Sequence, residues 1–296
     1  MDEASASSVP GQPSPQGVLV LGYWRHRVLA GGIRLLLAHC GAPFLDRRYE
    51  VGDGPDWDKS CWYDEAETLG LGAFPNLPYL IDGDVRVVQS DAILRYLARK
   101  FGLEGDDDAE KTLADQMVGV AKDQMDTFLS LTYARWLAKL RKQSWDEAAW
   151  EGERARYVEK RAPAAFAKFE AHLRGSRATT PATPSFPWFA GARVTYADFF
   201  IYELVDQHRG FCGPGVLDGL PLLTSFMARL EALENVSRYL ASDAFLARPY
   251  HNRYSQFTVA PGEAPYRAVH PGAASVARWP PEGPTPSGRR RLTDVN

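Results

Sequence analysis

Cysteine is scarce in this sequence. Its 296 residues include only Cys40, Cys61 and Cys212, and no two of them form a C-x-x-C pair. This spacing argues against a disulfide framework, a structural zinc site and a dithiol redox centre. The histidines show no metal-ligand spacing with one another or with the cysteines. We therefore expect no bound metal, and a protein suited to a reducing compartment.

The sequence also lacks a large excess of one charge and a long apolar run. Its 34 basic and 37 acidic side chains give a formal net charge of -3, so it has no broad basic field of the kind that binds nucleic acid or anionic membranes. No apolar segment is long enough for a membrane span, and the start of the chain does not resemble a signal peptide. We expect a cytoplasmic protein that binds neither nucleic acid nor membrane.

The two ends of the chain differ in composition from its middle. Residues 1 to 16 and those beyond about 258 are biased toward Pro, Gly, Ser and Arg. Such segments bury too little apolar surface to offset the entropy of ordering, so both ends are predicted to be mobile. The 45% hydrophobic content of the whole chain is sufficient for two modest domains.

Strand and helix signals alternate in the first third of the chain. Residues 18 to 24 form an apolar run that predicts a strand, and a helical pattern then stops near Gly41. Residues 44 to 51 predict a second strand, and a long connection follows over residues 52 to 73. This order is a β-α-β beginning.

A hairpin and a helix follow this connection. Asp82-Gly83-Asp84 separates two strand-like segments and carries the Asp-Gly preference of hairpin turns. Ser90 is predicted to cap a helix that ends at Gly102. An α/β domain is therefore predicted.

From about Asp108 onward, strand signals give way to helical ones. Segments rich in Ala, Leu, Glu, Lys and Arg predict helices near 108 to 140 and 145 to 174, and further helices begin near Thr195 and Pro221. Residues 177 to 186 are predicted to form a loop. The resulting division is an N-terminal extension over 1–16, an α/β domain over 17–105, an all-helical domain over 106–246 and a C-terminal extension over 247–296, mostly disordered beyond about 258.

Three fragments of the α/β domain suggest a site for a thiol peptide. The first-strand Tyr23 can donate a hydrogen bond to a thiolate, and the start of a helix at Gln89-Ser90 can bind a carboxylate with its free N–H groups. A turn at Leu77-Pro78 can pair with the backbone of a peptide. Each fragment alone also has an ordinary structural explanation, as core packing, a helix cap or a turn.

The fragments Leu21-Gly22-Tyr23-Trp24, Phe74-Pro75-Asn76-Leu77-Pro78-Tyr79-Leu80-Ile81-Asp82-Gly83 and Gln89-Ser90 occur in that order. Together they resemble cytosolic glutathione transferases of the mu class, and the resemblance extends over residues 17 to 256. Gly52 to Trp62 is similar to a loop of that class, and Pro187 to Phe199 is similar to its helical-domain signature. The resemblance implies a thioredoxin-like N-terminal domain, an all-helical C-terminal domain and a homodimer. Reduced glutathione would be the co-substrate, with no permanently bound cofactor.

The resemblance also implies roles for individual residues. Tyr23 is the catalytic residue. The Leu77-Pro78 bond is cis and leaves the backbone groups of Leu77 free to pair with the cysteinyl part of glutathione. Glutathione contacts fall on Tyr23, Trp24, Lys59, Trp62, Asn76, Leu77, Gln89 and Ser90, together with the partner subunit's Asp123. Leu29 and Tyr133 border the pocket for the electrophilic second substrate, and Asp123 and Tyr133 are predicted to share one long helix. Phe74, Arg95 and Arg99 lie at the dimer interface.

Two positions depart from the family pattern. Lys59 occupies a position where the family usually has arginine, which keeps the charge but loses the fork geometry. Ala66 occupies the position of a family lysine that contacts the glycyl end of glutathione. Weaker glutathione binding is therefore expected.

The leading hypothesis is an enzyme that conjugates glutathione to apolar electrophiles. The missing lysine at Ala66 motivates an alternative, a non-catalytic carrier of hydrophobic ligands. The two extensions alone motivate a third, an interaction module. A dithiol oxidoreductase is disfavoured because Tyr23 stands where such an enzyme needs cysteine. Fold by itself does not distinguish these functions.

Overall fold

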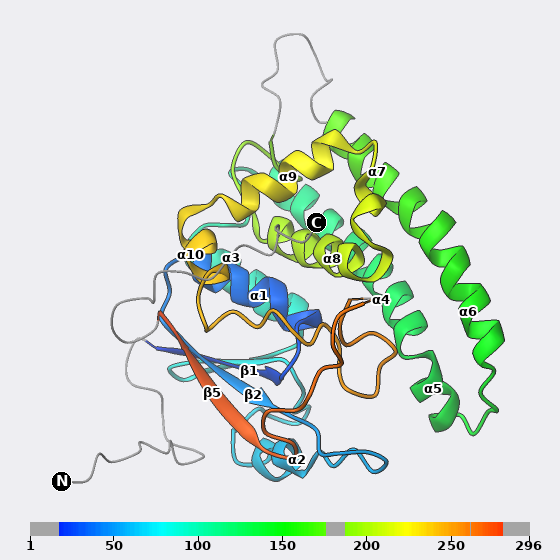
Figure 1. Cartoon of the computed structure of the whole chain (residues 1–296). Helices are drawn as coiled ribbons and strands as arrows, with labels where there is room; N and C mark the ends of the chain where they lie inside the picture. The colour runs from blue at the N-terminus through cyan, green and yellow to red at the C-terminus, as the bar shows by residue number, and fades with distance from the viewer. Residues whose placement is uncertain (1–17, 176–186, 261, 281–296) are drawn as a thin grey trace.

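A computed structural model describes residues 18–175, 187–260 and 262–280, and a five-stranded sheet lies at one end of the molecule (Figure 1). The strand order is β4-β3-β1-β2-β5. The central strand β1 (Leu19–Trp24) runs parallel to β2 (Phe44–Tyr49) and antiparallel to β3 (Tyr79–Asp82). The buried position of β1 follows from its apolar sequence LVLGYW.

The helices of the first domain cover both faces of this sheet. α1 (Val28–His39) and α3 (Ser90–Phe101) lie on the side toward the rest of the chain, and α2 (Ser60–Ala66) lies on the opposite side (Figure 1). β4 (Val85–Val88) forms the predicted hairpin with β3. Gly83 makes the turn with φ of +56°, a region that glycine adopts without strain.

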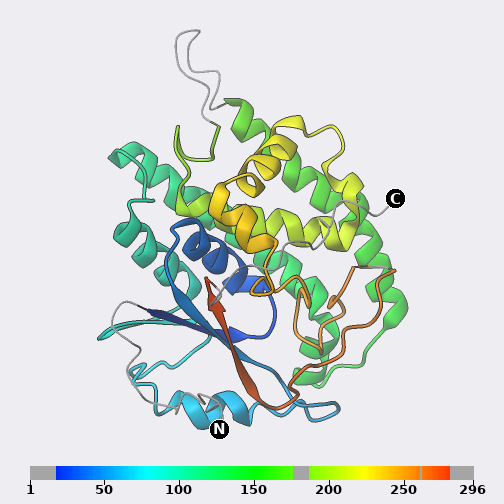
Figure 2. The same cartoon turned by 60° about the vertical axis from the view of Figure 1, so that its left-hand side comes forward.

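Helices make up most of the remaining described chain. α8 (Tyr196–Cys212) is central and buried, and packs against α1 (Figure 2). A Cβ added to Gly32 of α1 would lie 2.9 Å from the Phe199 carbonyl oxygen, so the absence of a side chain permits this close approach. The other helical elements are α4 (Asp108–Thr132), α5 (Ala134–Leu140), α6 (Glu147–Arg156), a π-helical segment (Tyr157–Arg161), α7 (Ala162–Gly175), a 3-10 turn (Pro214–Leu217), α9 (Pro221–Glu231) and α10 (Glu234–Leu240).

The predicted helices are confirmed with two changes. The segment over 108–140 is broken at Tyr133, which separates α4 from α5, and the segment over 145–174 contains the π-helical segment. The helix expected after Thr195 is present, and its Asp198 carboxylate accepts a hydrogen bond from the Thr195 N–H at 2.7 Å. Residues 177 to 186 and the N-terminal extension lie outside the described residues. Within the part described, no helix is both long and apolar enough to cross a membrane.

The prediction that the chain is disordered beyond about 258 is wrong for residues 262 to 280. β5 (Ala274–Trp279) pairs antiparallel with β2, with Trp279 opposite Phe44. The Trp279 side chain is 3% exposed and its ring lies 5.1 Å from that of Tyr239. A short strand between proline- and glycine-rich segments gives a weak sequence signal, and its pairing partner lies more than two hundred residues earlier in the chain.

Candidate active site

Tyr23, the predicted catalytic residue, lies buried at the end of β1. Its side chain is 4% exposed, and the ring of His26 lies edge-on at 5.0 Å. Burial raises the pKa of the Tyr23 hydroxyl well above its ordinary value, while a backbone hydrogen bond from Leu29 and the charge of Arg34 act in the opposite direction. The phenol is therefore protonated at neutral pH, and can donate a hydrogen bond to an anion.

The start of α3 is the predicted binding site for a carboxylate. Gln89, the residue before the helix, has φ of +75°, a strained conformation for a residue other than glycine. The predicted capping role of Ser90 is wrong, because Ser90 is the first helical residue and its hydroxyl lies 3.4 Å from the Asp91 carboxylate. The side chain of the N-cap residue Gln89 makes no capping hydrogen bond. It therefore leaves the first N–H groups of α3 to a ligand.

The Leu77-Pro78 bond is cis, as predicted. The backbone N–H of Leu77 is not free, however, because it donates a hydrogen bond to the Asn76 side-chain oxygen at 2.9 Å. The expectation of two free backbone groups is therefore wrong for the N–H. A peptide ligand could pair with this group only after the exposed Asn76 side chain turns away.

The aromatic residues Trp24 and Trp62 both lie beside Tyr49. Trp62, on α2, is 5% exposed and stacks on Tyr79 with ring centroids 5.9 Å apart. Trp24 contacts Tyr49 edge-on at 6.4 Å. Trp62 therefore anchors α2 against the sheet through hydrophobic packing. Ala66, on the same helix, is buried and contributes no charge.

Lys59 precedes α2 and reaches toward the helical domain. Its ammonium lies 5.2 Å from the centre of the Trp136 ring and 5.1 Å from that of Tyr254. Desolvation lowers the pKa of this lysine. The cation thus lies where the first domain, α5 and the C-terminal segment meet, the last being residues 241–260 and 262–280, which follow α10.

Tyr133 lies at the junction of α4 and α5. Its hydroxyl accepts a hydrogen bond from the Asn252 N–H at 2.9 Å, and its ring stacks on His251 with centroids 5.5 Å apart and planes inclined by 6°. Burial raises its pKa well above the ordinary value, with further contributions from the nearby hydroxyls of Tyr254 and Tyr23. A negative charge on the Tyr23 oxygen would thus disfavour ionisation of Tyr133, and whether the two phenols share one site stays a prediction.

Asp123 lies on the exposed surface of α4, away from the buried face of that helix. Because α4 ends at Thr132, the prediction that one helix carries both Asp123 and Tyr133 is wrong. Phe74 is 81% exposed and Arg99 is exposed, while Arg95 pairs with Asp115 at 2.9 Å. The assignment of Phe74, Arg95 and Arg99 to a dimer interface stays a prediction.

The C-terminal segment contributes contacts that the sequence did not predict. Arg253 donates to the carbonyl oxygens of Val51 and Gly52 at 3.3 Å and pairs with Asp53 at 2.5 Å. This ties the segment to the connection after β2. The only sequence signal was the aromatic and basic run from Tyr250 to Tyr254, which carried no recognised motif.

Glu50, the residue after β2, binds residues 266 to 270 of the C-terminal segment. Its carboxylate is 3% exposed and accepts hydrogen bonds from the Tyr266 hydroxyl at 2.7 Å, the Val269 N–H at 3.1 Å and the His270 N–H at 2.6 Å. Hydrogen bonds to a buried carboxylate are among the stronger ones in proteins. A small cavity of about 10 Å³ remains between this segment and the ends of β1 and β2.

Two family models match the chain. The glutathione S-transferase N-terminal domain matches residues 19–99, and the glutathione S-transferase C-terminal domain matches residues 135–243. Glutathione S-transferase Mu 2 of Mus musculus is 40% identical over 231 residues, which are 78% of this chain and 94% of that protein. Glutathione S-transferase Mu 3 of Homo sapiens is 37% identical over 244 residues, 82% of this chain and 97% of that protein.

Solved structures agree with these matches. The crystal structure of glutathione S-transferase Blo t 8 has a TM-score of 0.68 and 27% identity, and covers 80% of this chain and 99% of that chain. The pi-class glutathione S-transferase of Onchocerca volvulus gives a TM-score of 0.63 with the same identity and coverage. The predicted fold class, a thioredoxin-like domain followed by an all-helical domain, is confirmed. The chain belongs to the glutathione S-transferase family, and its relatives at 37% to 40% identity are of the mu class.

Proposed function

We propose that this protein conjugates reduced glutathione to hydrophobic electrophiles and thereby acts in detoxification. The observation that carries the proposal is the buried, protonated Tyr23 phenol at the end of β1. The membership of the chain in the glutathione S-transferase family supports the same reaction. Glutathione is a co-substrate in this proposal, and no permanently bound cofactor is needed.

Tyr23 would act by favouring the thiolate of bound glutathione. A free thiol has a pKa near 8.5 and is mostly protonated at pH 7, whereas only the thiolate attacks electrophiles well. A hydrogen bond from the phenol to the sulfur anion contributes about 1.5 to 3 kcal/mol, which lowers the thiol pKa by roughly one to two units. The thiol proton leaves to solvent, and Tyr23 keeps its own.

The thiolate then forms the new carbon–sulfur bond directly. Its electron pair attacks the electrophilic carbon, and the leaving group departs with the electrons of the bond that breaks. The product is a thioether, and no covalent enzyme intermediate forms. Leu29 and Tyr133 would border the electrophile.

The tripeptide would extend along the first domain. Its γ-glutamyl carboxylate would bind at Gln89 and Ser90, and the partner subunit's Asp123 would reach its amine. The cysteinyl backbone would pair with Leu77, after Asn76 turns away. The glycyl carboxylate would lie near Lys59, with Trp24 and Trp62 beside it.

The proposal includes a homodimer in the cytoplasm. The exposed Phe74 would insert into the partner subunit, and Arg95 and Arg99 would lie along the interface. Sedimentation of the purified protein tests this assembly. A monomer at micromolar concentration would contradict it, and would also leave Asp123 without a glutathione to reach.

Turnover of a generic aryl halide tests the reaction. Tyr23→Phe removes only the hydroxyl, and Tyr63→Phe is a matched control because Tyr63 is 61% exposed on α2. We expect Tyr23→Phe to lower kcat/KM by about 10- to 100-fold, in line with the hydrogen-bond energy, and Tyr63→Phe to leave it unchanged. If wild type and Tyr23→Phe are equally slow while apolar dyes bind tightly, the protein is a carrier.

A further inference from the structure

We propose that Trp136 and Tyr254 are positioning residues for glutathione binding, because their rings hold the Lys59 ammonium for the glycyl carboxylate. The inference rests on the proposed function, and it assigns a role to two aromatic residues outside the first domain. Trp136 lies on α5, and Tyr254 belongs to the C-terminal segment.

The two rings and the ammonium form one compact group. The Trp136 and Tyr254 centroids are 4.5 Å apart with planes inclined by 31°, and the Lys59 ammonium lies within 5.2 Å of both centres. A lysine within about 6 Å of an aromatic centre is attracted to the π-electron face of the ring. Both rings thus stabilise the same charge.

Lys59 has the other property that an anion-binding cation requires, which is an unpaired charge. Among residues 18–175, 187–260 and 262–280, no carboxylate oxygen lies within 4.0 Å of its ammonium, in contrast to Arg47 on β2, which pairs with Glu65 at 2.7 Å. Partial burial of a charge without an opposite charge is unfavourable. A bound carboxylate would supply the missing partner.

The aromatic contacts compensate for two features of the sequence. A lysine has a flexible four-carbon stem and no fork geometry, so it loses more freedom than a preorganised group when it binds a carboxylate. Ala66 supplies no second cation on α2. Holding the ammonium in place before the ligand arrives therefore increases the affinity that a single lysine can provide.

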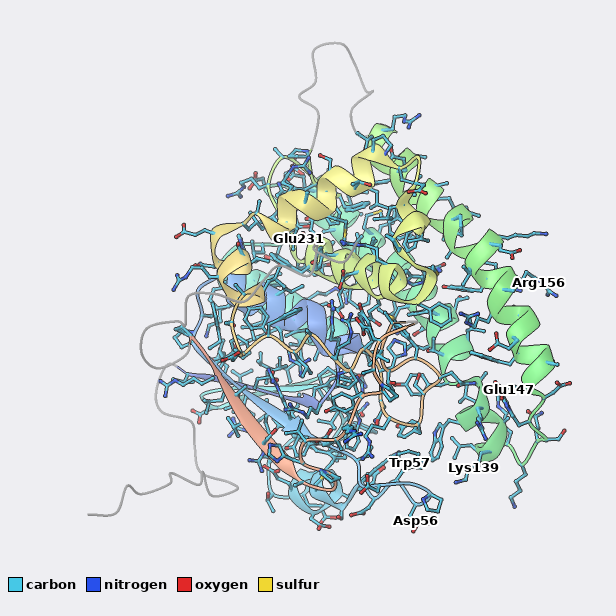
Figure 3. The ribbon with its side chains drawn as sticks, viewed as in Figure 1. Asp56, Trp57, Lys139, Glu147, Arg156 and Glu231 are labelled. Carbon is cyan, nitrogen blue, oxygen red and sulfur yellow. The ribbon has the colours of Figure 1, made fainter. Side chains whose placement is uncertain are left out.

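The aromatic pair is itself fixed by the fold. The Tyr254 ring contacts Trp57 at 6.0 Å and Tyr133 at 5.7 Å. Gln256 donates its backbone N–H to the Thr132 carbonyl oxygen at 2.8 Å, which ties the segment to the end of α4. Figure 3 shows that Trp57, on the connection after β2, and Lys139, on α5, lie along the same edge of the molecule.

A double-mutant cycle in the full-length protein tests the inference through the dissociation constant of glutathione, measured by calorimetry. Trp136→Leu and Tyr254→Leu should each weaken binding about fivefold, the effect of losing one cation–π contact. In the Lys59→Met background the same changes should have no further effect, because the cation is already absent. Trp136→Phe and Tyr254→Phe keep an aromatic ring and should restore most of the affinity.

Two controls separate this role from general effects. Lys139→Met removes an ammonium that lies 5.5 Å from the same Trp136 ring and should leave glutathione affinity unchanged. Glutathione whose glycyl carboxyl group is an amide should bind wild type weakly and be insensitive to Trp136→Leu. The inference is overturned if Lys59→Met binds glutathione as tightly as wild type, or if Trp136→Leu weakens binding equally in the Lys59→Met background.

The result of the double-mutant cycle does not depend on the test of the conjugation reaction. Binding of glutathione is measured without an electrophile, so it does not depend on the acceleration by Tyr23. If Tyr23→Phe turns over as fast as wild type, the proposed mechanism fails. If Tyr23→Phe is slow but the cycle shows no coupling between Lys59 and Trp136, only the positioning role fails.

Discussion

Replacing Trp279 by alanine tests whether β5 is an integral part of the sheet. The Trp279 side chain is 3% exposed, lies opposite Phe44 of β2 and contacts the ring of Tyr239 at 5.1 Å. It therefore joins the first domain's sheet to α10 of the second. Val276, on the same strand, is 44% exposed and is the matched control.

The expected loss of stability in Trp279→Ala follows from the burial of the tryptophan side chain. Truncation of a buried tryptophan to alanine costs about 3 to 5 kcal/mol, from lost transfer energy together with the cavity that remains. The lost edge-to-face contact with Tyr239 is part of this total. Val276→Ala removes mostly solvent-exposed atoms, and surface changes of this kind stay within about 0.5 kcal/mol.

Urea denaturation at one fixed protein concentration, followed by circular dichroism, measures both variants. A fixed concentration matters because any dimer would stabilise the folded state by mass action. We expect a lower midpoint for Trp279→Ala, with little change in the slope of free energy against urea. A loss below about 1 kcal/mol for Trp279→Ala, or equal losses for both variants, would refute the docking of β5.

Three further predictions concern buried polar groups. Burial, together with the charge of Arg34, lowers the pKa of His26 from 6.5 to about 3, so below pH 6.5 the unfolded chain binds a proton that the folded chain excludes. The free energy of unfolding should therefore fall with decreasing pH, and His26→Leu should reduce this slope by up to about 1.4 kcal/mol per pH unit in acid titrations. Arg27 donates two hydrogen bonds to Glu203 inside the core, at 2.9 and 2.8 Å. Replacing Arg27 by methionine should lower the free energy of unfolding, measured by urea denaturation, by about 3 to 5 kcal/mol, and replacing Glu203 as well should make the loss smaller. Tyr133→Phe leaves the N–H of Asn252 unpaired and should cost about 1 to 3 kcal/mol in the same assay.

The sequence predicted the first domain well because its signals are local. The apolar run ending at Tyr23, the Asp82-Gly83-Asp84 turn and Gly102 each specify an element end without reference to the rest of the chain. The strand, hairpin and helix they predict are present in the structure. The break at Tyr133 was not predicted, since the helical pattern continues across it while Asn252 and His251 hold the tyrosine from outside.

The C-terminal extension could not be predicted by the same means. β5 depends on pairing with β2, and the buried Glu50 carboxylate receives its donors from Tyr266, Val269 and His270. These contacts join parts of the chain that are distant in sequence, so no local pattern reveals them. Composition alone therefore gave the wrong expectation of disorder.

The candidate site shows the same limit. Tyr23 and Gln89 were predicted from motifs in the first domain, and the cis Leu77-Pro78 bond from the family resemblance. Trp136 and Tyr254 carry no motif and approach Lys59 only in the folded chain. The hydrogen bond between Asn76 and Leu77 also depended on a side-chain rotamer that the sequence does not specify.

Ultraviolet difference spectroscopy of the glutathione complex at neutral pH tests the central claim most directly, because it measures the thiolate itself. We expect bound glutathione to be largely ionised in wild type, with the thiol pKa lowered by roughly one to two units. In Tyr23→Phe the bound thiol should titrate close to its value in free solution. A wild-type complex with no more thiolate than free glutathione at the same pH would contradict the account.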